Sequence, residues 1–530
     1  MQSILGKVSA TMSVLPEDAA APDARLPTLT LLLAIASLTH MVSFPWWMGL
    51  ASGQVLLAAT LVALFFPRSV VVLAGFLLAS LTFWWGRLPA VPNHILFEML
   101  VHLTLLAAIA VGFIVDKRDR SRGRQAASAV PRDLRPPETR PVSSGVESRS
   151  HALATPAAGR LASVAFEQAR PLIIAEMVVM YLYTVLHKLN HDFFNPAVSC
   201  AVSMHHELAA VVPWVPDGEW TWWPTIVGTL AIELAIPLLF ISRRTRTAGV
   251  LLGLVFHHFL ALHPHGGIYS FSGLLFALYA LLIPDANLQW IGKRWQAAPL
   301  AARIVGPLVV VGGFAATIFL QLAAYRGGRG FMAANGIGYT AWAPLAAMIA
   351  GVYVVALSVS SRTGSGVAAA TTADGLPTSG GPWRPLWILP LLVVLNGACP
   401  YLDLKTTTAF SMFSNLRTED GHNNHLFLPR LPLFGYQDDL VEVLEANDPR
   451  LAGLARSGDL LPWFEFRRIA STTRAGTVIR CRRNGQELVL RRDDPSPESQ
   501  EVFTPHPWWM AKLLVFRPIR PFGEPMTCRH

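Results

Sequence analysis

Long apolar windows recur along this 530-residue chain and constrain its fold more than any motif does. A window of about 20 apolar residues satisfies its own backbone hydrogen bonds within lipid as a helix, so such windows predict membrane spans. Charged residues make up 15% of the chain, against about 25% in soluble domains. The sequence therefore predicts an all-α polytopic membrane bundle of about 11 transmembrane helices, at residues 26–48, 51–66, 68–86, 94–115, 169–188, 221–241, 247–263, 267–284, 301–323, 339–360 and 385–400.

Composition divides the chain into five regions. We expect a disordered N-terminus (1–25), a first group of membrane helices (26–115), a basic disordered cytoplasmic linker (116–168), a membrane core (169–400) and an extramembrane domain (401–530). The last region carries strand-like runs at Asn424–Leu428, Leu440–Leu444 and Trp463–Ile469. Residues 478–490 alternate on both sides of Asn484-Gly485, which favours a type I′ hairpin. A small, mostly antiparallel β domain is expected there.

Basic residues in short loops predict the orientation. The net charge of +9 is spread over loops such as 116–124, 242–247 and 292–295 rather than forming a nucleic-acid-binding patch. Cytoplasmic placement of these loops puts the N-terminus in the cytoplasm and the C-terminal domain on the external or periplasmic side, with Arg326 and Arg329 as an exception. No cleavable signal peptide is expected, because the N-terminus is polar and the first apolar run is of spanning length. We therefore predict a multi-pass protein of the bacterial inner membrane.

The four cysteines all fall on the side predicted to be oxidising. An even number of cysteines there permits disulfides, but the spacing does not identify the pairs. Our working hypothesis pairs Cys200 with Cys399 and Cys481 with Cys528.

Polar groups from distant segments are predicted to meet at one membrane face. Asn93 and His94 open the fourth span, Lys188 ends the fifth, Glu233 lies inside the sixth, and His257 and Ser272 flank the turn after the seventh. Ionisable residues at membrane depth are costly and indicate function. The histidine-rich run at 257–265 does not predict a metal site, because no cysteine or carboxylate stands nearby at ligand spacing.

Lys188 is the most informative of these residues. Only six of the 43 basic residues are lysines, and lysine, unlike arginine, can act as a neutral base. Asp192 lies four residues later, where on a continuing helix it would stabilise the charged form. The residues alone leave open a general base, a surface ion pair and a snorkelling side chain. Glu233 as an inter-helix hydrogen-bonding group and His94 as a partner of a loop carbonyl are equally open.

At these positions the sequence resembles the horizontally transferred transmembrane family, which includes vitamin K-dependent gamma-glutamyl carboxylase. The element Lys188-Leu189-Asn190-His191-Asp192-Phe193 is similar to the carboxylase's active-site lysine motif. Other matches occur in the same order along the chain, at Asn93-His94, Arg170, Glu233, Phe256-His257 and Phe271-Ser272.

The resemblance implies a chemistry and a set of ligands. Lys188 would be the catalytic base and His94 would assist it, with Asn93, Asp192, Glu233, His257 and Ser272 in support. The ligands would be reduced vitamin K or a related lipid quinol, with oxygen and carbon dioxide as co-substrates and no metal. The acceptor would be an unknown protein or small molecule on the outer side. Phe193 replaces a tryptophan of the family motif, and the domain at 401–530 is too small to include the carboxylase's propeptide-capturing part.

Three functions follow as hypotheses. The first is a carboxylase or quinol-epoxidase-like lyase. The second is a non-catalytic membrane scaffold in which Lys188 orders a loop and the external domain binds a partner. The third is a transporter with Lys188 and Glu233 on an ion path, which the lack of an internal repeat disfavours.

Overall fold

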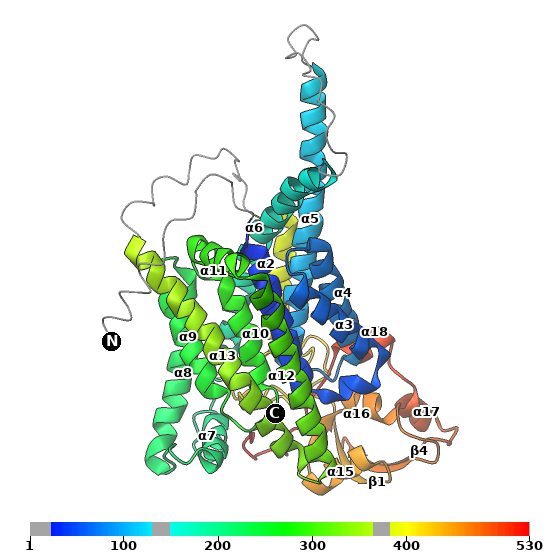
Figure 1. Ribbon diagram of the computed structural model, residues 1–530. Coiled ribbons are helices and arrows are strands. Elements are labelled where there is room, and N and C mark those ends of the chain that lie inside the picture. Colours follow the sequence, from blue (N-terminus) through cyan, green and yellow to red (C-terminus); the bar gives the residue numbers. More distant parts are fainter. Residues whose placement is uncertain (1–22, 130–148, 364–381, 529–530) are drawn as a thin grey trace, which may run out of the picture.

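The computed structural model describes residues 23–129, 149–363 and 382–528. Within them, seven helices are long and apolar enough to cross a membrane, or eight if one sharply bent pair forms a single span. The protein is therefore a multi-pass, mainly helical membrane protein (Figure 1). Helices also form at the remaining predicted spans, but α3, α9 and the η4–α14 segment have only 10–17 residues, so a count of 11 spans is not confirmed.

The helices of the membrane region follow the apolar windows closely. They are α2 (Arg25–Ser43), η1 (Pro45–Gly49), α3 (Ala51–Phe65), α4 (Val70–Arg87), α5 (Asn93–Ala129), α6 (Arg149–Leu186), α7 (Cys200–Val211), α8 (Glu219–Ile241), α9 (Arg246–Leu260), α10 (Ile268–Leu278), η3 (Tyr279–Leu281), α11 (Asp285–Ala297), α12 (Leu300–Arg326), α13 (Gly330–Thr363), η4 (Arg384–Trp387) and α14 (Ile388–Ala398).

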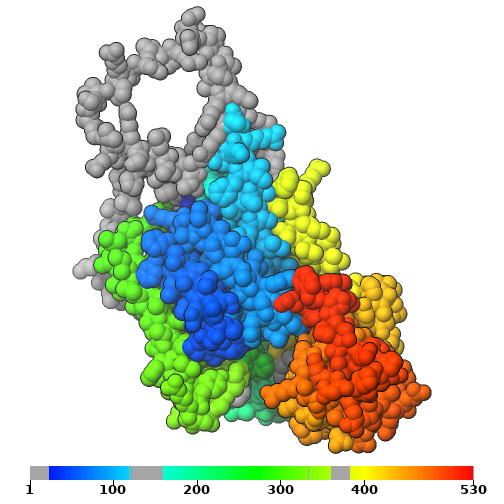
Figure 2. Space-filling model, turned by 90° about the vertical axis from the view of Figure 1, so that its right-hand side faces the viewer, coloured from blue at the N-terminus to red at the C-terminus, as the bar shows by residue number. Residues whose placement is uncertain are grey.

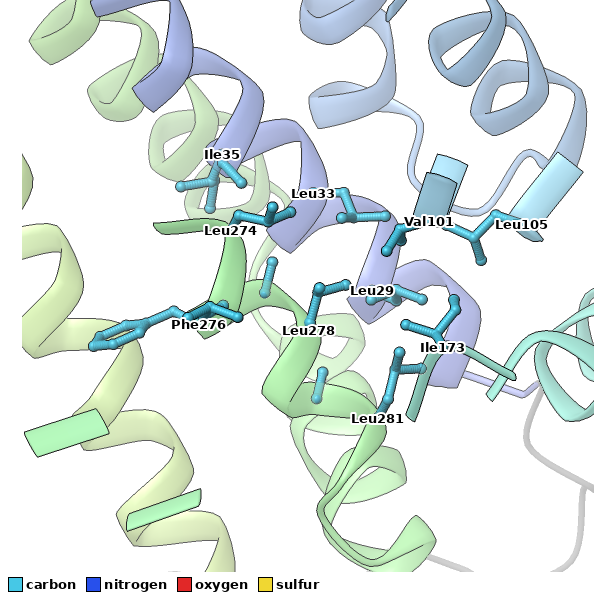
Figure 3. Packing of buried hydrophobic residues seen from close by; sticks show 14 of the residues in the cluster. Leu29, Leu33, Ile35, Val101, Leu105, Ile173, Leu274, Phe276, Leu278 and Leu281 are labelled. Atoms are coloured by element: carbon cyan, nitrogen blue, oxygen red, sulfur yellow. The ribbon is translucent and has the colours of Figure 1, made fainter. Parts of the chain in front are cut away.

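Helix α2 occupies the centre of the bundle. Other parts of the protein bury 78% of the most apolar 18-residue segment of α2. The corresponding share is 22% for α8, α12 and α13, whose apolar side chains face outward. Helices α6 and α10 pack against α2, and apolar side chains of α2, α5, α6 and α10 meet in the core (Figure 3). A helix apolar on all sides is stable only where protein or lipid surrounds it, which explains this ordering.

The chain turns sharply between α10 and α11. The two helices meet at an angle of 109°, and the break leaves backbone carbonyls without helical partners. The Arg170 guanidinium donates to the Leu281 carbonyl at 2.7 Å and to the Ile283 carbonyl at 2.9 Å. Arg170 and Arg25 both also contact the Asp285 carboxylate. An arginine cluster therefore stabilises the end of the bundle opposite the C-terminal domain.

The C-terminal domain combines a small sheet with short helices. Its antiparallel strands have the order β2-β1-β3-β4, with bounds β1 (Leu440–Ala446), β2 (Leu460–Pro462), β3 (Val478–Arg483) and β4 (Gln486–Arg491). The predicted hairpin is confirmed, because Asn484 and Gly485 both have positive φ, at 50° and 77°. The helices are α15 (Pro449–Ser457), α16 (Trp463–Ala470), α17 (Pro497–Phe503) and α18 (Trp508–Leu513).

Two strand predictions for this domain were wrong. Trp463–Ile469 forms helix α16, since its apolar residues line one helical face and bury Trp463 and Phe466 against the sheet. Asn424–Leu428 contributes only an isolated bridge between His425 and Asn190. The domain is therefore mixed α and β rather than mostly β.

The domain is attached to one end of the bundle (Figures 1 and 2). The Lys512 ammonium of α18 donates to the Trp85 carbonyl, in the last turn of α4, at 3.0 Å. We call this end of the bundle the domain end. The orientation of the two ends relative to the cytoplasm stays a prediction.

Other parts of the predicted organisation need correction. Cys200 forms a disulfide with Cys528, while Cys399 and Cys481 are free and buried, so the predicted pairing was wrong. The linker between the two helices is shorter than the predicted 116–168, because α5 continues to Ala129 and α6 begins at Arg149. Residues 130–148 and most of the predicted N-terminal region lie outside the described residues.

Candidate functional site

A mostly apolar cavity of about 650 Å³ lies at the domain end of the bundle. Helices α5, α6, α7, α8, α9 and α10 contribute to its walls. Aromatic side chains are prominent in its lining, namely Phe44, Trp46, Phe97, Tyr181, Phe193, Phe256, Phe259, Phe271, Phe331, Phe410 and Phe413. Such a cavity, with a few convergent polar groups, has the form of a small-molecule site.

Lys188 faces this cavity and pairs with Glu233. Helix α6 ends at Leu186, so Lys188 lies in the following turn, and its ammonium donates to Glu233 Oε2 at 2.5 Å. The exposed fractions of the two side chains are 7% and 13%. A charge at membrane depth needs a partner, and the partner of Lys188 comes from α8, 45 residues away.

Asp192 does not share this role. The helix does not continue past Leu186, so Asp192 is not on a common helical face with Lys188. Its Oδ2 instead accepts from Asn424 Nδ2 at 2.8 Å and from the Met526 amide at 3.0 Å. Asp192 therefore anchors the turn to the C-terminal domain, and the hypothesis of a Lys188–Asp192 ion pair was wrong.

Asn93 and His94 both line the cavity but do different things. Asn93 Oδ1 accepts from the Phe410 amide at 2.6 Å. The His94 ring stacks on His40 at a centroid distance of 5.5 Å and lies tilted against Phe271 at 5.7 Å, and its Nε2 lies 3.2 Å from Ser270 Oγ. Asn93 is a positioning residue, whereas His94 presents a titratable ring to the cavity.

His257 lies on the cavity wall with a chain of hydroxyl groups behind it. Its Nε2 is 2.6 Å from the Tyr181 hydroxyl, which is 2.9 Å from the Tyr279 hydroxyl. The Ser272 hydroxyl donates to the His257 carbonyl at 3.0 Å and to the Ile268 carbonyl, and it does not line the cavity. Ser272 thus positions the α9 backbone, and the phenols orient the imidazole.

A strap of residues 404–413 covers the cavity, and the sequence analysis did not identify it. Thr408, Phe410 and Phe413 take positive φ values of 57° to 61°, which non-glycine residues adopt only when surrounding contacts hold them. The Asn396 side chain provides one such contact by donating to the Thr408 carbonyl at 3.0 Å. No apolar period marks such a segment, so its position depends on tertiary contacts.

Burial disfavours the protonated form of several groups around the turn and the strap. Burial lowers the pKa of His187 to about 4, and its Nε2 lies 3.0 Å from the Gly397 carbonyl. Burial also lowers the pKa of His265, which lines the cavity, and of Lys405 in the strap. Burial therefore disfavours a positive charge on His187, His265 and Lys405.

The sequence analysis also did not identify three buried polar residues near the cavity, namely His40 on α2 and Glu98 and His102 on α5. The spacing of His94, Glu98 and His102 places them on one face of α5, which is a signal that the sequence does carry. Among the described residues no group of three or more histidine, cysteine or acidic side chains is arranged to hold a metal ion. No family model, curated protein or solved structure matches this chain.

Proposed function

We propose that the protein is a membrane enzyme of the carboxylase or quinol-epoxidase type, in which Lys188 removes a proton from a hydroxyl group on an apolar ring. The observation that carries this proposal is the buried Lys188–Glu233 pair on the wall of an aromatic-lined cavity. The cavity is within the volume range of sites for cofactor-sized ligands. Its apolar walls suit reduced vitamin K or a related lipid quinol, and its paired polar groups suit a ring hydroxyl.

Glu233 explains how Lys188 can serve as a base. The ionic pair and the neutral pair hold the same number of protons, so moving one from the ammonium to the carboxylate leaves the net charge unchanged. The neutral amine then accepts the hydroxyl proton: the O–H bond breaks, an N–H bond forms, and the ammonium lies beside the new oxygen anion. A low-dielectric site strengthens that attraction.

The other site residues have supporting roles. His94 and His257 lie on the same cavity as Lys188 and are held by Ser270 and Tyr181. Asn93 holds the strap over the cavity through Phe410. When bound, the quinol would supply the oxygen-dependent chemistry, with carbon dioxide as co-substrate and an acceptor protein or small molecule reaching the cavity from the domain end.

The experiment is oxygen-dependent conversion of reduced vitamin K to its epoxide by the purified protein. We expect turnover in the wild type, loss of turnover in Lys188→Ala and Lys188→Arg, and full turnover in Lys512→Ala, which lies outside the cavity. Lys188→Arg keeps the positive charge but cannot act as a neutral base, so its loss separates proton transfer from ion pairing. Unchanged turnover in Lys188→Ala, or none in the wild type with several reduced quinones, contradicts the proposal.

One observation favours a scaffold as the second candidate. The turn that carries Lys188 is tied to the C-terminal domain, since Asn190 Nδ2 donates to the Ser414 carbonyl at 2.6 Å and the His191 amide donates to the Asn424 carbonyl at 3.0 Å. Lys188 would then order this junction. In that case Lys188→Arg, which retains the ion pair with Glu233, keeps normal function while Lys188→Ala loses it.

A further inference from the structure

A row of polar side chains leads from the cavity into the core of the bundle. His94, Glu98 and His102 follow one another along one face of α5, and His40 of α2 lies opposite them. The exposed fractions of all four residues are 4% or less. Only His94 of this set lines the cavity.

The distances along the row bring Glu98 close to two imidazoles, whereas the His40 and His94 rings are stacked and must rotate before a proton can pass between them. His40 Nε2 lies 3.3 Å from Glu98 Oε2, and His102 Nε2 lies 3.6 Å from Glu98 Oε1. The rings of His40 and His94 are nearly parallel at 22°, with centroids 5.5 Å apart. Neither ring nitrogen of His40 or His102 makes a hydrogen bond with another described residue. Glu98 is therefore the carboxyl group that joins the two imidazoles.

Electroneutrality limits how many protons this group carries. An isolated ion at this depth is costly, because the low-dielectric core does not replace the hydration that the ion loses. The set of His40, Glu98 and His102 is neutral when Glu98 is protonated and both imidazoles are neutral. It is also neutral with one imidazolium and a Glu98 carboxylate, but that state separates two charges over imperfect hydrogen-bond geometry. The favoured resting state has a single proton on Glu98.

The row opens toward the cavity and is closed at its other end. Beyond His102 the core includes Leu29, Leu33, Leu105, Ile173 and Leu281, which come from α2, α5, α6 and η3 (Figure 3). Arg25 and Arg170, which both pair with Asp285, lie at the end of the bundle opposite the domain end. Glu176 of α6 is the other carboxyl group near this layer, and its Oε1 accepts from the Thr104 hydroxyl at 2.5 Å. Glu98 and Glu176 are thus two separate buried carboxyl groups with different partners.

We propose that Glu98 is an internal proton donor for the cavity, connected to it through His40 and His94. When an anion forms at the cavity wall, the Glu98 O–H bond breaks and an N–H bond forms at His40 Nε2. The His40 ring then rotates out of its stack with His94 and releases its Nδ1 proton to one nitrogen of His94, and His94 releases the proton on its other nitrogen to the anion. The end state is a Glu98 carboxylate, neutral imidazoles and a protonated cavity group. The nature of that anion depends on the proposed function, but the protonation of Glu98 does not.

Infrared spectroscopy of the full chain in lipid vesicles tests the resting state without any ligand. We expect a protonated carboxylic acid band that shifts in D₂O and is lost in Glu98→Gln, a variant that keeps the side-chain shape. Glu176→Gln is the matched control, since it changes a buried carboxyl group outside the row and leaves this band in place. The proposal is overturned if the wild type shows no carboxylic acid band, or if its band persists in Glu98→Gln.

A hydroxynaphthoquinone dye tests the connection to the cavity, because its anion and its neutral acid differ in visible absorbance. We expect the pH midpoint of the bound dye to be about 1 unit lower in Glu98→Gln than in the wild type, and unchanged in Glu176→Gln. Equal midpoints in all three proteins overturn the connection. A dye that fails to bind the wild type counts against the quinol function and against a proton donor that serves this cavity, whereas the infrared result still decides whether Glu98 is protonated.

Discussion

The Lys188–Glu233 pair permits a double-variant test of the site. At the 2.5 Å separation of the two atoms, Coulomb attraction is about 6–7 kcal/mol with an effective dielectric constant of about 20. Desolvation of the two ions offsets most of this attraction, so the net contribution of the pair is small. Removing one partner is different, because it leaves a buried charge and costs about 3–5 kcal/mol. We therefore expect Lys188→Met and Glu233→Gln to be strongly destabilising singly and much less so together.

Thermal unfolding with a thiol-reactive fluorescent dye measures this, since Cys399 and Cys481 are buried and free in the folded protein. The two single variants should react at clearly lower temperatures than the wild type, and the double variant should recover most of the loss. Glu445→Gln is the matched control, because the Glu445 and Arg480 side chains of its pair are 75% and 50% exposed and such exposed pairs contribute about 0–1 kcal/mol. Additive losses in the double variant would refute a direct contact between Lys188 and Glu233.

Three further predictions concern structure and pH. Mass mapping without reduction should find one disulfide, Cys200–Cys528, and two free thiols; any other pairing contradicts the chain path. The pKa of His187 is lowered to about 4 by burial, against about 6.5 when unfolded, so the unfolded state binds more protons between these values. Stability should fall as pH drops through this window, and a His187→Asn variant should lose that dependence; an equal slope in both proteins contradicts it. Gly253→Ala places a methyl group 2.5 Å from the Tyr279 hydroxyl behind the cavity and should destabilise the protein by about 1–3 kcal/mol. Gly312→Ala is the control, because its methyl group enters open space and should leave stability unchanged. Equal melting temperatures of the two variants count against this packing.

Local sequence patterns predicted the helices well and the C-terminal domain only in part. The backbone must hydrogen-bond to itself in lipid, so apolar windows such as 94–115 and 221–241 determine helices whatever surrounds them. The Asn484-Gly485 turn was predictable for a similar reason, since its positive φ values depend on those two residues alone. The helix at Trp463–Ile469 was not predictable, because a short apolar run fits a strand or a helix until packing against another surface selects one of them.

The site was predictable in its residue types and in its coarse location. Lys188, Glu233, His94 and His257 were singled out because ionisable groups at membrane depth are costly, and all four line one cavity. The roles of Asp192 and Ser272 were not predictable, because the end of α6 at Leu186 and the packing of α9 on α10 decide where they point.

By itself, the sequence determined that this is a multi-pass helical membrane protein with a lysine at a span end. Only the tertiary structure decided the partners. Lys188 meets Glu233 across 45 residues, Cys200 meets Cys528 across 328, and His40 meets Glu98 from another helix. The physical reason is that helix formation in lipid is a local requirement, whereas the pairing of buried charges, thiols and rings depends on which helix faces pack together.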